Sequence, residues 1–192
     1  MSAGVDLAVS STGYHFKLHQ QVLFQLETQA RRDLYAKRPD IWALDMLGIT
    51  LWSGQKNIAM SIVENKNTMV AAGHGVGKSL LTAVLACWWI DTHEIGKATV
   101  LSTAPSSSQV RNIIWRSIQE MHALSKKRHK EYERLLEAGK STRGYPDHRL
   151  PGYVLSDATW KTDEGIPIGF GRTPPRGREG DTFQGIHGNV FA

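Results

Sequence analysis

The 192-residue chain lacks the features that mark secreted and membrane-embedded proteins. Cys87 is its one cysteine, so an intramolecular disulfide is excluded and a buried, reduced thiol is expected. No run of apolar residues approaches the ~20 that a helix needs to cross a bilayer. The first eleven residues also lack the charged start and apolar middle of a secretory signal. These absences predict a cytoplasmic protein with no membrane partner.

The composition is that of a folded chain with a mild excess of positive charge. Hydrophobic residues make up 41% and charged residues 21% of the sequence, close to the averages for globular domains, and the length suits one substantial core. Lys and Arg number 23 against 18 Asp and Glu, a net charge of +5. This excess favours anionic partners, but it does not distinguish nucleotides from nucleic acid or lipid.

The spacing of apolar residues predicts helices at first and then an alternation of strands and helices. Residues 1–38 are expected to form a loose leader and a helix, and two short helices follow, the first stopped by Gly48. The later elements are expected as a strand at 68–72, a helix at 78–96, a strand at 98–105, a long helix at 107–139, and weaker strands at 153–160 and 166–171. The alternation is typical of a parallel sheet covered by helices.

A glycine-rich loop, "AAGHGVGKS", joins the strand at 68–72 to the next helix. Its glycines let the backbone approach phosphate groups, and the N–H groups at a helix start attract anions. Lys78 is expected to reach the β- and γ-phosphates as the catalytic residue, and Ser79 to bind Mg²⁺. The strict GxxxxGK[S/T] pattern requires glycine where Ala72 stands. The alternative interpretation is a tight strand-to-helix turn with an exposed Lys78.

Four segments in order extend the pattern beyond the loop. They are "DIWALDMLGITLWSGQKNIAMSI", "AAGHGVGKS", "ATVLSTAPSSSQVRNIIWRSI" and "DTFQGIHG". The series resembles the N-terminal ATPase half of phage terminase large subunits, the motors that pump DNA into capsids, from about Pro39 onward. The resemblance implies an α/β P-loop NTPase fold of the RecA and helicase kind, in which helices flank a parallel sheet. Residues 39–192 would then be a partial ATPase domain after the leader and helix of residues 1–38.

The resemblance also implies which residues bind ATP. Gln55 matches the glutamine that reads the adenine edge in this family, and an amide can donate and accept in one plane. His74 stands where many terminases have an arginine near the γ-phosphate, but a histidine is shorter and mostly neutral near pH 7. The expected ATP-binding residues are Gln55, Gly73, His74, Gly75, Val76, Gly77, Lys78, Ser79 and Leu80.

Two later regions are candidate DNA contacts. Thr103, Ser106 and Gln109 are polar residues at the end of a predicted strand, where α/β sheets present functional groups; helix capping by Ser106 or Ser107 is the alternative. Basic residues of the following helix suit phosphate binding, but acidic neighbours leave a solvated charged face as the alternative. These basic residues are Arg111, Arg116, Lys126, Lys127, Arg128 and Lys130.

Phosphoryl transfer in this class needs an acidic pair that ends an apolar strand, and the sequence shows none. Asp157, Asp163 and Glu164 lack the required flanking residues. We therefore expect the chain to stop before its Walker B strand, to bind ATP and Mg²⁺ only weakly or in part, and to be inactive alone.

The resemblance implies that the full-length protein couples ATP hydrolysis to DNA translocation in the host cytoplasm. Double-stranded DNA, a terminase small subunit, the portal and further copies of the chain would be its partners. A helicase-like ATPase fragment and a nonenzymatic remnant that binds DNA or subunits are the alternatives.

Overall fold

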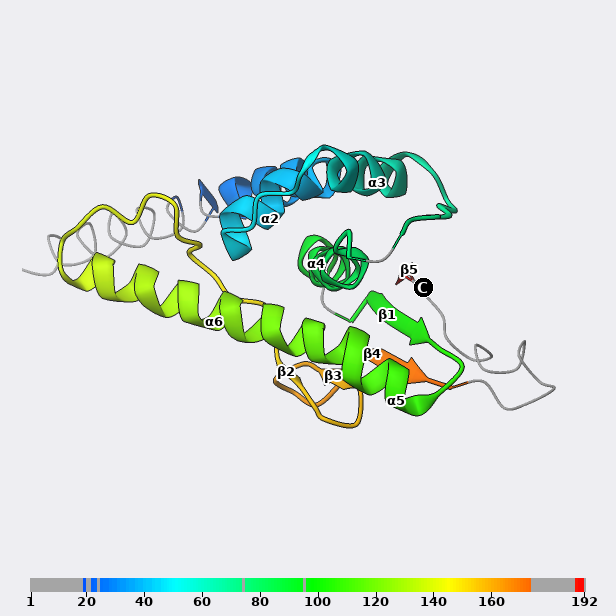
Figure 1. Cartoon of the computed structure of the whole chain (residues 1–192). Helices are drawn as coiled ribbons and strands as arrows, with labels where there is room; N and C mark the ends of the chain where they lie inside the picture. The colour runs from blue at the N-terminus through cyan, green and yellow to red at the C-terminus, as the bar shows by residue number, and fades with distance from the viewer. Residues whose placement is uncertain are drawn as a thin grey trace, which may run out of the picture. The chain divides into compact units, whose positions relative to one another are not determined.

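The computed structural model describes residues 19, 22–23, 25–73, 75–94, 96–173 and 189–191. The chain divides into two compact units, Met1–Leu34 and Tyr35–Ala192. The described residues of the first unit are helical, and Gln29 Nε2 donates a hydrogen bond of 2.9 Å to Asp33 one turn later. The labelled helices and strands of Figure 1 all belong to the second unit.

The second unit begins with two short helices whose limits follow from their end residues. Pro39 opens α2 (Pro39–Leu47), where the N–H that proline lacks has no helical acceptor. Gly48 ends α2 in the left-handed conformation, at φ 68°, as predicted. The next helix, α3 (Ser53–Glu64), ends where Asn65 Nδ2 donates to Ser61 O at 2.9 Å.

The predicted apolar helix after the glycine loop is α4 (Lys78–Thr92), which lies between α2 and α3 on one side and β1 on the other (Figure 1). Its predicted apolar face, Leu81, Val84, Leu85 and Trp88, is buried, and so is the free thiol of Cys87. Both predictions are confirmed. The indole N–H of Trp88 donates to the carbonyl of Tyr35 at 2.7 Å, which ties α4 to the start of the unit.

The sheet is mixed, so the predicted fold class is wrong. Its strand order is β2-β3-β4-β1-β5. The strands are β1 (Ala98–Thr103), β2 (Tyr153–Val154), β3 (Thr159–Lys161), β4 (Pro167–Arg172) and β5 (Asn189–Phe191). β1 pairs in parallel with β4 and β5, whereas β3 pairs antiparallel with β2 and β4. This is not the parallel sheet of a P-loop NTPase.

Two local features explain the difference. The segment expected as a strand at 68–72 forms none, and Met69 within it is 98% exposed. The strand expected at 153–160 is divided by a turn in which Ala158 has a φ of 64°, and Gly165, at φ 84°, lies in the next turn. Such short connections join antiparallel neighbours, because a parallel neighbour needs a long crossover.

The long helix predicted at 107–139 is confirmed as three consecutive pieces. They are α5 (Ser107–Gln109), a π-helical stretch η1 (Val110–Trp115) and α6 (Arg116–Glu137). Trp115 Nε1 donates to Ser102 Oγ of β1 at 2.7 Å. A Cβ atom at Gly171 of β4 would lie 2.4 Å from that indole nitrogen, so glycine at this position lets η1 pack closely on the sheet.

Candidate functional site

The glycine loop turns the chain directly into the start of α4. Gly75 and Gly77 have φ values of 80° and 82°, a region that residues with a side chain rarely adopt. Gly77 precedes the helix, which has no side-chain cap and no acidic residue in its first turn. The first N–H groups of a helix have no acceptor within the helix and carry partial positive charge. The loop and helix start therefore form a candidate anion site.

Lys78 is the first residue of α4, and its ammonium group lies over the loop that precedes it. Nζ donates to Ala72 O at 2.7 Å and also to Gly73 O. Both acceptors are neutral carbonyl groups. A phosphate oxygen is a stronger acceptor because charge-assisted hydrogen bonds are about twice as strong as neutral ones. The ammonium group is thus placed at the loop, with partners that an anion can replace.

Gln55 of α3 is brought against the glycine loop. Its side chain is buried, and a Cβ atom added to Gly77 would lie 2.8 Å from Gln55 Nε2. Gln55 Oε1 accepts from the backbone N–H of Trp52 at 3.4 Å, so one end of the amide caps α3. The amide therefore lies beside the glycine loop, with its oxygen engaged by the Trp52 N–H.

The other predicted ligands differ in their surroundings. Val76 and Leu80 are each 38% exposed, and Ser79 is half-buried in the first turn of α4. His74 lies outside the described residues. No group of three His, Cys, Asp or Glu side chains suited to a metal ion occurs in the part of the chain that the structure describes. A Mg²⁺ ion at this loop would therefore be held by Ser79 and by the phosphates themselves.

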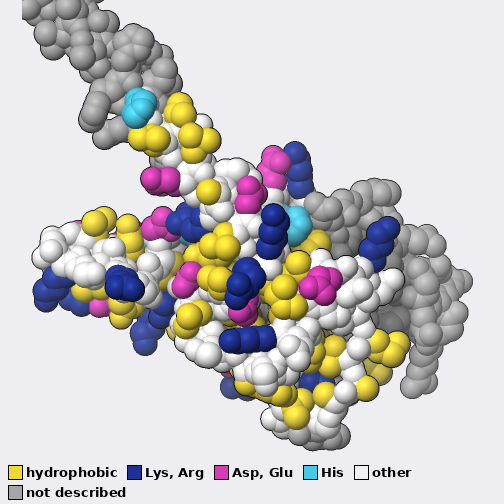
Figure 2. Space-filling model, turned by 90° about the horizontal axis from the view of Figure 1, so that it is seen from above, with side chains coloured by type: hydrophobic (Ala, Val, Ile, Leu, Met, Phe, Trp, Pro, Cys, Tyr) yellow, Lys and Arg dark blue, Asp and Glu magenta, His cyan; other side chains and the backbone are white. Residues whose placement is uncertain are grey.

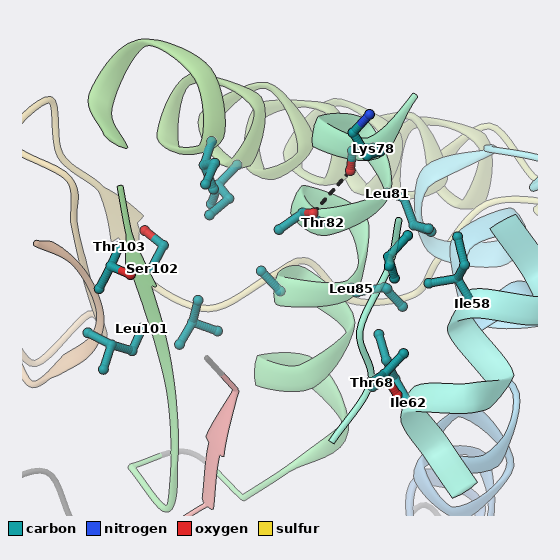
Figure 3. Close-up of a pocket in the computed structure, with 15 residues that line it drawn as sticks. Ile58, Ile62, Thr68, Lys78, Leu81, Thr82, Leu85, Leu101, Ser102 and Thr103 are labelled. Atoms are coloured by element: carbon teal, nitrogen blue, oxygen red, sulfur yellow. Dashed lines mark hydrogen bonds between the residues drawn. The ribbon is translucent and has the colours of Figure 1, made fainter. Parts of the chain in front are cut away.

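A largely apolar cavity of about 400 Å³ extends inward from Lys78 between α3, α4 and β1 (Figure 3). Ile58 and Ile62 of α3 and Leu81 and Leu85 of α4 line it, and Ser102 of β1 contributes a hydroxyl group. Thr82 Oγ1 donates to Lys78 O at 3.0 Å within α4. Thr68 and Thr103 also line the cavity with hydroxyl groups, but most of its lining is apolar, so the charged part of the candidate site is Lys78 with the loop.

Two of the candidate DNA contacts, Ser106 and Arg128, have partners within the protein. Ser106 Oγ accepts from Gln109 N at 3.2 Å, which is the capping alternative. Arg128 donates to the carbonyl groups of Asp45 and Gly144 and lies 5.2 Å from the ring centroid of Tyr145. Arg128 thus joins α2, α6 and the loop after α6. On the face shown in Figure 2, basic and acidic side chains are interspersed among apolar ones over the described residues.

A largely buried polar network around Asp91 lies outside every site predicted from the sequence. Asp91 of α4 accepts from Trp42 Nε1 at 2.7 Å and lies 3.2 Å from His148 Nε2. Its side chain is only 7% exposed. Trp42 lies 49 positions before Asp91, and His148 lies 57 positions after it, so no local sequence pattern relates the three residues. The sequence feature that points to this network is Asp91 itself, a charged residue in the largely apolar second half of α4.

The described residues form a largely helical fold with a small mixed sheet and a candidate anion site at the start of α4. No protein-family model, no curated protein and no solved structure matches the chain. Among the described helices, none combines the length and apolarity that crossing a membrane requires.

Proposed function

We propose that residues 73–80 bind the phosphate tail of a nucleoside triphosphate, ATP together with Mg²⁺, with Lys78 as the main cationic contact. The observation that carries the proposal is the uncapped start of α4 after two left-handed glycines, with the Lys78 ammonium held over the loop. Oriented N–H groups, a helix dipole and one cation are the elements that stabilise phosphate oxygens.

The wider proposal is that this phosphate site belongs to a phage DNA-packaging motor of the terminase kind. The order of the four sequence segments supports it, and the contact of Gln55 with Gly77 is consistent with it. The mixed sheet lends no support, so the proposal depends on the loop and on the resemblance. Double-stranded DNA, a small subunit, a portal and further copies of the chain are the partners that it implies.

Calorimetric titration of the chain with ATP and Mg²⁺ tests the phosphate site. In Lys78→Ala we expect the affinity to fall at least about tenfold, because a charge-assisted contact contributes roughly 1.5–3 kcal/mol. Lys66→Ala is the matched control: it removes the same charge from an exposed position shortly before the loop. We expect that control to bind within about twofold of the unmodified chain, because exposed charges contribute little.

Two results would contradict the proposal. One is an unmodified chain that does not bind ATP with Mg²⁺ while its circular dichroism shows it folded. The other is an equal loss of affinity in Lys66→Ala and Lys78→Ala, which would mean that the binding follows net charge and not the loop.

A further inference from the structure

A second, polar pocket of about 640 Å³ lies beside the start of the long helix. It shares no lining residue with the cavity at Lys78. Its lining includes the guanidinium groups of Arg111 and Arg116, the amide of Asn112, and the hydroxyl groups of Ser107, Ser108 and Ser156. None of its described lining residues is acidic. The pocket therefore presents hydrogen-bond donors and positive charge together.

The π-helical stretch is what aligns the two arginines. The backbone N–H of Arg116 donates to Arg111 O, a bond that spans five residues. In an ordinary α-helix, residues five apart point about 140° away from each other, because one turn takes 3.6 residues. A turn closed by a five-residue hydrogen bond brings them toward one side. The π-helical turn is therefore consistent with both arginines lining the same pocket.

Hydrogen bonds hold the walls of the pocket in place. Arg111 Nε donates to Ser107 O at 3.4 Å, and Asn112 Nδ2 donates to Ser108 Oγ at 3.2 Å. Across the pocket, Gln119 Nε2 donates to Leu155 O at 3.0 Å, which ties the helix to the turn that carries Ser156. These bonds restrict the Arg111 and Asn112 side chains before any ligand arrives, which lowers the entropy cost of binding.

Among the described residues, the acidic partner of Arg116 is Glu120, and this ion pair is weak. Arg116 Nε lies 3.3 Å from Glu120 Oε1, and the two side chains are 74% and 58% exposed. Ion pairs at such exposed positions contribute little, because water screens them and both side chains lose freedom. A phosphate group, which carries more charge and can accept two parallel N–H bonds from one guanidinium, is a better partner for Arg116.

We infer that this pocket binds a phosphate group through Arg111 and Arg116, with Asn112 and the serine hydroxyls as further donors. The phosphate is either part of a nucleic acid backbone or part of a small phosphorylated molecule, since both present the same oxygen atoms. The site is separate from the glycine loop, and it does not depend on ATP binding there.

The test uses the whole chain carrying Lys78→Ala, so that the glycine loop contributes as little as possible. Inorganic phosphate is titrated by calorimetry, and a short DNA duplex and single strand are titrated by fluorescence anisotropy at several salt concentrations. The variant adds Arg111→Gln and Arg116→Gln. The control adds Lys66→Gln and Lys140→Gln, which remove the same charge from exposed positions outside the pocket.

We expect the arginine variant to lose at least about tenfold in affinity for the probe that binds, while the control stays within about twofold. If the phosphate belongs to DNA, the slope of log affinity against log salt concentration should also be shallower in the arginine variant, by the amount expected for about one lost phosphate contact or more. Binding of inorganic phosphate with no tighter binding of DNA supports the small-molecule source. The inference is overturned if no probe binds, or if the variant and the control lose affinity equally while both remain folded.

Discussion

His122 shows how one buried side chain makes the fold sensitive to pH. It is 5% exposed on α6; Nε2 lies 3.1 Å from Pro151 O, and the ring meets Trp160 edge-on at 5.5 Å. Burial lowers the pKa of His122, and the charges of Lys126 and Arg149 lower it further, while the bond to Pro151 O opposes them. A carbonyl oxygen only accepts, so the neutral ring carries its proton on Nε2.

We expect the free energy of unfolding to fall as the pH is lowered from about 7.5 to about 5.5, because His122 takes up a proton near its ordinary pKa of ~6.5 only when the chain unfolds. The stability that the neutral His122 ring contributes is complete above that ordinary pKa and is lost as the pH falls below it. In His122→Gln, which keeps an N–H donor for Pro151 O, the loss should be shallower. Urea unfolding at a series of pH values measures this pH dependence of the free energy of unfolding, and His129→Gln is the control from the same helix. An unchanged pH dependence in His122→Gln would rule this account out.

Among the elements, α2, α4 and the segment after α6 are joined at Asp91. The carboxylate is nearly buried, and it is satisfied by the indole N–H of Trp42 and by His148. The other ring nitrogen of His148 lies 3.0 Å from Asp147 Oδ1. A buried carboxylate is costly unless donors surround it, so this contact determines where three elements meet.

Trp42→Phe keeps most of the ring volume but removes the donor to Asp91. We expect it to lower the free energy of unfolding by about 1–3 kcal/mol, because a buried charged acceptor loses a partner. Trp88→Phe is the matched comparison, since that buried indole donates to a neutral carbonyl, Tyr35 O, and we expect it to cost less. Chemical denaturation compares the two variants. Equal costs would show that the charge on Asp91 is not what the indole stabilises.

For the molecule as a whole, the segment before the glycine loop is the exposed connection between α3 and α4. Residues 64–67 and 69–73 are exposed, and the segment forms no strand. Exposed connections of this kind are the preferred sites of proteolytic cleavage.

We expect limited trypsin digestion to cut after Lys66, and ATP with Mg²⁺ to slow that cut if the loop binds phosphate. Mass spectrometry identifies the fragments, and Lys66→Gln should abolish this one cleavage. In Lys78→Ala the cut should remain but lose its protection by nucleotide. Protection that persists in Lys78→Ala would place the nucleotide elsewhere.

The sequence by itself determined the helices and the position of the loop. The apolar face of α4, the stop of α2 at Gly48, the burial of Cys87 and the long helix after Ser106 all follow from residues within a few turns of one another. Helical hydrogen bonds and caps join near neighbours in the chain, so a local window contains the information.

Only the tertiary structure decided the sheet and the polar contacts. A strand needs a partner backbone that is distant in sequence, and residues 68–72 have none among the described strands, so they lie outside the sheet. The same reason applies to Gln55 beside Gly77, to Arg128 on the carbonyl of Asp45, and to Trp42 on Asp91. Each of these contacts depends on the distance between two elements, and that distance is set only when the core packs.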